Sequence, residues 1–161
     1  MLKVIGNYTL SDIKSSIIYL LDLSAKSPEV RQHAIEITSD SQDKISAVYD
    51  WVKEHISYIP DPIGATGSEI ELFISPVRMV EDFKLGLKPA GDCDDHALLV
   101  TALYRSLSMP SNVVLVDFGG GLEHAYTRVK SEKLGEWVVV DTTSSTPLGW
   151  IYKEKVGEIV V

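Results

Sequence analysis

The segment from Asp92 to Leu107 constrains the fold most, because its middle is apolar on nearly every side. Residues 97–100 read Ala-Leu-Leu-Val and residues 102–103 read Ala-Leu, which leaves little helical surface for solvent. A helix of this kind is buried among other elements. We therefore expect a helix over about 92–107 at the centre of the domain. The chain has 161 residues, enough for one domain with a sizeable core and little room for a second.

Spacing and capping residues predict further helices before this segment. Apolar residues recur at helical spacing over about 11–23, with Ser11 as the expected N-cap, and again over about 42–56. Ser27-Pro28 and Ser75-Pro76 each predict a helix start, because serine caps well and proline fits the first helical position. After Tyr58, closely spaced prolines and glycines indicate a long irregular connection.

The pattern changes to β after Met109-Pro110. Three segments rich in β-branched and aromatic residues follow, namely Val113–Phe118, His124–Lys130 and Trp137–Thr143. Helices first and an antiparallel meander last favour an α+β fold over a doubly wound parallel sheet. If a four-residue loop joins the last two strands, Lys130 faces Gly135 and His124 lies directly opposite Asp141. A slip of one residue would put these two side chains on different faces.

Charge and cysteine content exclude several classes of partner. Fifteen Lys and Arg stand against 23 Asp and Glu, a net charge of −8 that repels phosphate backbones, so we expect no nucleic-acid partner. A single cysteine cannot form an intramolecular disulfide, which suits a reducing compartment. The longest apolar run, Ile17–Leu23, is far shorter than the roughly 18 residues that cross a bilayer, and no secretory leader is apparent. We expect a cytoplasmic protein without membrane insertion.

The residues that carry chemistry surround this cysteine. With Asp92 as the N-cap, Cys93 is the first residue of the buried helix and Asp95 completes a pair resembling a capping box. The helix start favours the thiolate and offers an N–H donor to an oxyanion, whereas the neighbouring carboxylates raise the thiol pKa. A histidine that takes the thiol proton becomes a cation and would compensate for the effect of these carboxylates. His124, oriented by Asp141, completes the arrangement of nucleophile, base and orienting group.

The other three histidines are interpreted as structural. His33 and His55 lie in helical patterns without companion residues. His96 follows Cys93 by one helical turn, where both side chains project outward, and we interpret it as a supporting or surface residue.

These motifs together resemble the transglutaminase-like superfamily of papain-type cysteine enzymes. They are Gly91-Asp92-Cys93-Asp94-Asp95-x-Ala97, then His124-Ala125-Tyr126, then Glu136–Thr143, with Trp51-Val52 and Tyr58–Pro62 resembling the segment before the nucleophile in bacterial and phage-borne members. The resemblance covers roughly residues 45–150. It implies a papain-like core, with one domain over 1–161 made of a helical part (1–57) and a catalytic core (58–161). It also implies Cys93 as nucleophile, His124 as base and Asp141 as the residue that orients the imidazole.

The family's reactions are acyl transfers on several substrates, so the resemblance leaves the function open between classes. We expect a cysteine peptidase or amidase that cleaves peptide or isopeptide amides through a thioester, with a protein or peptide as its partner. A protein-glutamine cross-linking transglutaminase is one alternative. A non-catalytic binding or assembly module of phage type, associated with the virion, is another.

The acidic cluster of Asp92, Asp94 and Asp95 has two interpretations. It caps the helix and compensates its dipole, or it binds calcium, since clustered carboxylates suit a hard cation and some bacterial relatives use acidic residues beside the nucleophile in this way. EF-hand spacing is absent, and we expect no required cofactor. A zinc site is chemically acceptable but would block the nucleophile; its ligands would be Cys93, His96, His124 and Asp141.

Overall fold

A single helix, α5 (Cys93–Ser106), occupies the centre of the protein, with the other elements packed around it. The structure is a computed structural model that describes residues 2–6, 8–62 and 70–161. Its other helices are α1 (Leu10–Ala25), α2 (Pro28–Thr38), α3 (Lys44–His55) and α4 (Pro76–Lys84). Its strands are β1 (Leu2–Gly6), β2 (Ser57–Tyr58), β3 (Ile70–Ile74), β4 (Ala90–Gly91), β5 (Ser111–Asp117), β6 (Leu122–Lys130), β7 (Trp137–Val140) and β8 (Gly157–Val160).

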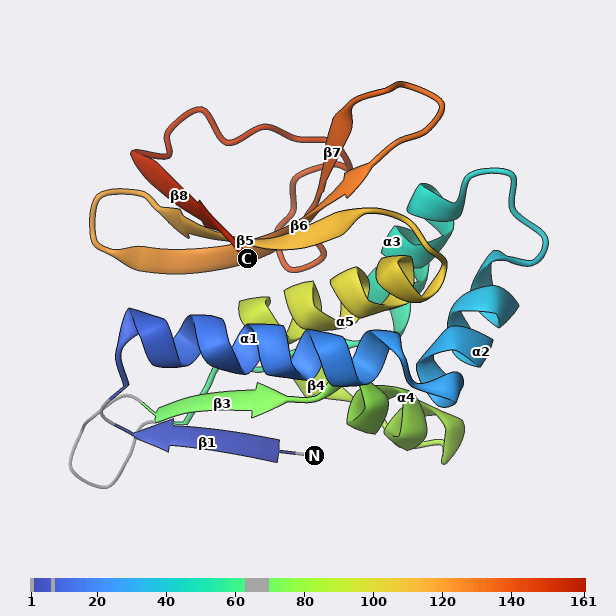
Figure 1. The fold of residues 1–161 in the computed structure, drawn as a ribbon, viewed down its shortest axis with the longest axis horizontal. Helices are drawn as coiled ribbons and strands as arrows, with labels where there is room; N and C mark the ends of the chain where they lie inside the picture. The colour runs from blue at the N-terminus through green and yellow to red at the C-terminus, as the bar shows by residue number, and fades with distance from the viewer. Residues whose placement is uncertain (1, 7, 63–69) are drawn as a thin grey trace.

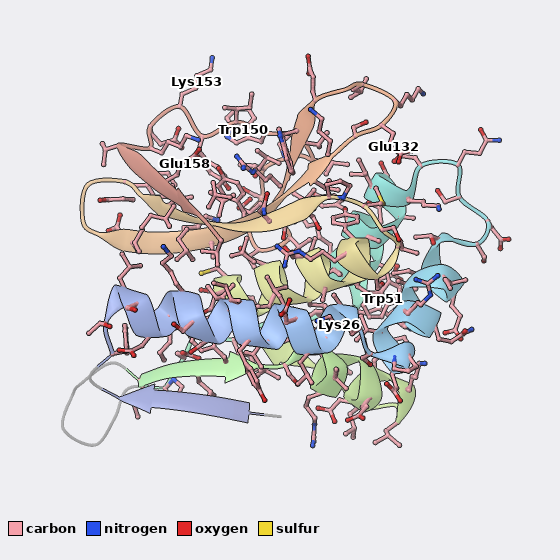
Figure 2. All side chains as sticks on the ribbon, in the orientation of Figure 1. Lys26, Trp51, Glu132, Trp150, Lys153 and Glu158 are labelled. Atoms are coloured by element: carbon pink, nitrogen blue, oxygen red, sulfur yellow. The ribbon has the colours of Figure 1, made fainter. Side chains whose placement is uncertain are left out.

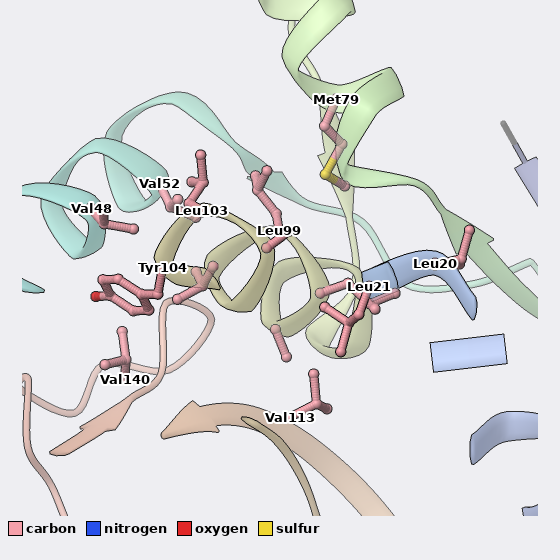
Figure 3. Packing of buried hydrophobic residues seen from close by; sticks show 14 of the residues in the cluster. Leu20, Leu21, Val48, Val52, Met79, Leu99, Leu103, Tyr104, Val113 and Val140 are labelled. Atoms are coloured by element: carbon pink, nitrogen blue, oxygen red, sulfur yellow. The ribbon is translucent and has the colours of Figure 1, made fainter. Parts of the chain in front are cut away.

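The elements form layers on either side of the α1 and α5 helices. In Figure 1 the sheet of β5 to β8 lies above α1 and α5, while the β1–β3 ribbon and α4 lie below them. The helix α5 packs against all four other helices and against β5 and β6. Its side chains Leu98, Leu99 and Leu103 have no exposed surface, and Figure 3 shows Leu99 and Leu103 within the main core. The prediction of a central buried helix is confirmed.

The helix starts follow the capping residues of the sequence, with one correction. Ser27 and Ser75 cap α2 and α4 as predicted, each accepting a hydrogen bond from a backbone N–H three residues on. Helix α1, however, has Thr9 rather than Ser11 as its N-cap, two residues earlier than predicted. Thr9 and Asp12 form a capping box in which the Asp12 carboxylate accepts from the Thr9 backbone N–H at 2.8 Å.

The C-terminal sheet is antiparallel, as expected of the α+β class, with the strand order β7-β6-β5-β8. The predicted hairpin register is wrong by two residues. Lys130 pairs with Trp137 rather than with Gly135, and the Ser131 backbone N–H closes the longer loop on the carbonyl of Glu136 at 2.8 Å. Side chains alternate with period two, so a shift of two leaves every residue on its predicted face.

Several strands were not predicted. The ribbon of β1 with β3 and the parallel bridge of β2 with β4 lie in segments read as irregular or helical, and β8 follows the predicted meander. Part of the connection after Tyr58, residues 63–69, lies outside the described residues. No helix in the described part of the chain is long and apolar enough to cross a bilayer.

The segment between β7 and β8 covers the outer face of the sheet. Trp150, Lys153 and Glu158 lie on the side of the sheet that faces away from the helices (Figure 2). Beneath this segment a small cluster of Val114, Val116, Tyr126 and Tyr152 is buried separately from the main core. The sheet is therefore packed on both faces near its centre.

Candidate active site

The cysteine stands at the N-terminus of α5, held by the short bridge of β2 with β4. The Ser57 N–H donates to the carbonyl of Pro89 at 3.0 Å, and the Ile59 N–H donates to that of Gly91 at 2.9 Å. Asp92 is the N-cap and Cys93 the first helical residue, as predicted. The predicted capping role of the Asp92 side chain is wrong, because it makes no capping hydrogen bond within the described residues.

Asp95 has a second contact besides the predicted one with the N-cap, since a hydrogen bond from the Asp92 backbone acts to lower its pKa. Its Oδ1 accepts the backbone N–H of Ile74 at 2.7 Å, so this carboxyl connects the first turn of α5 to the end of β3. The sequence could not reveal this contact, because it joins the helix to a strand that was not predicted.

Strand β6 brings His124 to the same region. The Thr127 hydroxyl donates to the carbonyl of Ala97 at 3.0 Å and lies 2.9 Å from the Thr101 hydroxyl, so β6 is joined to α5 near the helix start. Cys93 precedes Ala97 by about one helical turn, and His124 precedes Thr127 by three residues. Cys93 and His124 both line one cavity of about 550 Å³.

The histidine and Asp141 are hydrogen-bonded. His124 Nε2 lies 2.6 Å from Asp141 Oδ2, although the observed register, if continued, puts Thr143 opposite His124. Asp141 stands two residues before Thr143, on the same face, within diagonal reach of the ring. An ionised carboxylate only accepts, so Nε2 carries the ring proton and Nδ1 is left as the acceptor of the neutral imidazole.

The Asp141 carboxylate is held by donors on both oxygens. Its Oδ1 accepts the backbone N–H groups of Thr143 at 2.9 Å and Ser144 at 3.2 Å, and its Oδ2 accepts from His124 and from the Tyr152 hydroxyl. Burial acts to raise the pKa of Asp141, but the hydrogen bonds from His124 and Tyr152 outweigh it and hold that pKa well below its usual value. Asp141 is therefore ionised at neutral pH.

The electrostatics around the thiol oppose its ionisation. Burial raises the pKa of Cys93 to about 12, the charge of Asp92 adds to this effect, and the Ala125 backbone N–H acts against it. The favourable influence expected from the helix start is therefore outweighed. In the protein alone the sulfur carries its proton at neutral pH, so a nucleophilic role requires a base.

Carboxyl groups dominate the polar lining of the cavity. The side chains are those of Asp61, Glu71, Asp92, Asp94 and Glu123, with no Lys or Arg among the described lining residues. Burial raises the pKa of Asp61 to about 6, against the Leu72 N–H that lowers it. Burial and the neighbouring carboxyls of Asp92 and Glu71 raise the pKa of Asp94 well above its usual value.

Two of these residues, Asp92 and Asp94, are close enough to Asp95 for the three to share one cation. Asp92, Asp94 and Asp95 each offer an oxygen within 4.8 Å of the others. One oxygen of each carboxyl is buried without a hydrogen-bond partner among the described residues. Burial raises the pKa of Asp95 to about 8, so the Asp95 carboxyl favours its neutral form at pH 7. Oxygen donors alone suit a hard cation such as calcium.

The remaining histidines are structural, and His96 is fully buried rather than at the surface. Its Nδ1 lies 3.0 Å from the Thr142 hydroxyl and its Nε2 lies 3.4 Å from the carbonyl of Ser57, so both ring nitrogens already have protein partners. The zinc interpretation loses His96 as a ligand for this reason. His33 and His55 lie in a ring cluster with Trp51 and Phe83, between α2, α3 and α4.

Tyr152 is the residue of this site that the sequence did not single out. It follows β7 by twelve residues in a segment without regular structure, and its hydroxyl reaches Asp141. No spacing or motif marks a tyrosine at that position.

Comparison with known proteins agrees with this fold. The model of the transglutaminase-like superfamily matches residues 30–142, while no curated protein sequence matches the chain. A candidate cysteine protease from Cytophaga hutchinsonii has a TM-score of 0.57 at 22% identity, over 98% of this chain and 53% of its own. A candidate protease from Parabacteroides distasonis has a TM-score of 0.57 at 19% identity, over 83% of this chain and 26% of its own. These structural likenesses concern the fold, and the chain spans about half of the first structure and about a quarter of the second.

Proposed function

The chain belongs to the transglutaminase-like superfamily, and we propose that it is a cysteine-dependent acyl-transfer enzyme, a peptidase or amidase that cleaves peptide or isopeptide amides. The observation that carries the proposal is the hydrogen bond of 2.6 Å between His124 and Asp141 at the cavity that Cys93 also lines. It leaves Nδ1 of a half-buried, oriented imidazole as a proton acceptor at the cavity of a thiol that needs one.

The proposed reaction proceeds through a thioester. The sulfur of Cys93 attacks the amide carbon while its proton passes to Nδ1 of His124, and the backbone N–H of Cys93 donates to the oxyanion. The imidazolium, stabilised by Asp141, returns the proton to the leaving amine as the C–N bond breaks. Water then loses a proton to His124 and attacks the thioester, which releases a carboxylic acid and restores the thiol.

Alkylation of the single cysteine tests the base. Iodoacetamide should label Cys93 faster than a free thiol at pH 6, and His124→Ala should abolish the excess. In that variant the rate should fall below that of a free thiol, because burial and Asp92 raise the thiol pKa. His55→Ala, a matched change in the distant ring cluster, should leave the rate unchanged. Equal labelling of the wild type and His124→Ala would refute the proposal.

Transamidation is a second candidate, favoured by the carboxyl groups of the cavity. An acidic cavity attracts amines, which are cations at neutral pH. Incubation of a peptide amide with a fluorescent primary amine separates the two reactions. Hydrolysis gives a carboxylic acid only, and transamidation attaches the amine to the acyl group. A protein that neither hydrolyses the amide nor labels at Cys93 would be the non-catalytic module.

We also propose that calcium binds at Asp92, Asp94 and Asp95, which supply buried oxygens that have no hydrogen-bond partner among the described residues. Binding requires ionised carboxylates, so it should release protons, and the heat measured by calorimetry should depend on the buffer. Calcium should also raise the melting temperature of chelator-treated protein. Asp94→Asn should weaken both effects, whereas Asp50→Asn on α3 should not. Unchanged melting at millimolar calcium would refute the site.

A further inference from the structure

We propose that Tyr152 is a positioning residue of the active site, one that fixes the Asp141 carboxylate and through it the His124 ring. The proposal rests on the proposed function for its catalytic meaning. The geometry on which it depends is independent of the reaction. Tyr152 also lies beyond residues 30–142, to which the family match extends.

The contact itself is direct and buried. The Tyr152 hydroxyl donates to Asp141 Oδ2, the same oxygen that accepts from His124 Nε2. The Tyr152 side chain is 8% exposed. Hydrogen bonds to an ionised acceptor are stronger than neutral ones, and more so away from water.

The backbone donors of Thr143 and Ser144 reach only the other oxygen, Oδ1. Without Tyr152, His124 would be the only donor to Oδ2 among the described residues. The carboxylate could then follow the ring when the ring moves, instead of holding it. Two donors on Oδ2, one from each side chain, remove that freedom.

The tyrosine is itself held in place by its surroundings. Its ring stacks on Tyr126 with centroids 5.7 Å apart and meets Phe118 at 5.6 Å. Its hydroxyl also lies 3.2 Å from the Ser144 hydroxyl. A rigid side chain anchored in the small outer cluster can therefore transmit its position to Asp141.

The same ring contacts the base directly. The Tyr152 and His124 centroids lie 5.8 Å apart in an edge-to-face arrangement, and the Phe118 ring stacks with the imidazole at 6.4 Å. The imidazole is thus confined by aromatic rings and by the carboxylate that Tyr152 holds. Both constraints leave Nδ1 in one orientation, which general base catalysis needs.

Tyr152→Phe tests the hydroxyl, and Tyr126→Phe is the matched control. Both variants remove one phenolic oxygen from the same ring cluster, but the Tyr126 hydroxyl contacts Glu158 at 3.4 Å and not Asp141. Two readouts are used at pH 7. One is the rate of Cys93 alkylation by iodoacetamide, and the other is the NMR signal of the His124 Nε2 proton, which reports its bond to Asp141.

Tyr152→Phe should reduce the His124-dependent alkylation rate about tenfold, as expected for one lost hydrogen bond to a charged group. It should also move the Nε2 proton signal, while Tyr126→Phe leaves both readouts at wild-type values. An unchanged signal and rate in Tyr152→Phe would overturn the proposal, as would equal effects of the two variants. If wild-type alkylation proves independent of His124, the proposed function fails, and the proton signal alone still decides the role of Tyr152.

A second measurement needs no change at Tyr152, in case the variant does not fold. In the wild type, the buried hydroxyl proton of Tyr152 should exchange slowly and give its own NMR signal. Asp141→Asn should shift that signal, because the acceptor loses its charge. A Tyr152 signal indifferent to Asp141→Asn would overturn the proposal.

Discussion

Replacing Gly91 with alanine should destabilise the protein and displace its nucleophile. Gly91 is buried two residues before Cys93, and its φ is not positive, so the effect is steric. A Cβ at this position would lie 2.5 Å from the Cβ of Asp95 and 2.8 Å from the terminal methyl of Met79. The methionine methyl can move. The Asp95 Cβ is fixed on α5, and its carboxyl is bonded to Ile74.

The magnitude follows from these contacts. Overpacking of a buried site costs about 1–3 kcal/mol. The alanine also restricts the unfolded chain, which offsets about 0.4–1 kcal/mol. A net loss of about 1–2 kcal/mol corresponds to a melting temperature lower by roughly 2–8 °C for a chain of this size. Because relief of the clash moves the first turn of α5, alkylation of Cys93 should also slow.

Gly120→Ala is the matched control for this prediction. Its Cβ would meet Glu123 Oε1 at 2.2 Å, a closer approach than any at Gly91, but that oxygen ends an exposed and flexible side chain. The melting temperature of Gly120→Ala, measured by calorimetry, should therefore stay near that of the wild type. Melting of Gly91→Ala at the wild-type temperature, or an equal loss in both variants, would refute the steric reasoning.

Two further predictions concern the core and the pH dependence of stability. Leu99→Ala should cost about 2–5 kcal/mol in urea unfolding, because Leu99 is fully buried against α5's neighbours, whereas Leu85→Ala at an exposed site should cost little. Burial lowers the pKa of His33 below 6.5, so the unfolded chain binds more protons there, and His33 contributes a fall in the free energy of unfolding as pH drops from 7.5 to 5.5, opposite in sign to the contributions of Asp61 and Asp95. His33→Gln should flatten that fall, and an identical pH profile in this variant would count against it.

The sequence predicted the helical part well because local signals determine it. Ser27 and Ser75 each precede a proline, and a cap of this kind needs no distant partner. The buried helix α5 was predicted from the apolar residues on nearly every side of its segment. The start of α1 was missed because Thr9 and Asp12 form a capping box one turn earlier than the apolar spacing begins.

The missed strands depend on partners remote in sequence. Strand β3 is paired with β1, almost seventy residues earlier, and β4 is a two-residue bridge to β2. Neither strand has an alternating pattern long enough to mark it. The contact of Asp95 with Ile74 was missed for a related reason, because it depends on the position of β3.

The pairing of His124 with Asp141 was found although the loop length behind it was wrong. Burial constrains which face a residue occupies, and Ala125, Thr127 and Val129 all face the core, so β6 cannot turn over without exposing them. Loop length is under no such constraint, and an error of two residues leaves the face unchanged. The hydrophobic pattern therefore predicts which face of the sheet a residue occupies, even where it does not predict the strand register. A diagonal pair of long side chains, such as His124 and Asp141, can still meet when the register is wrong by two residues. Tyr152 has no such support, since it lies in a segment without regular spacing, and only the fold brings its hydroxyl to Asp141.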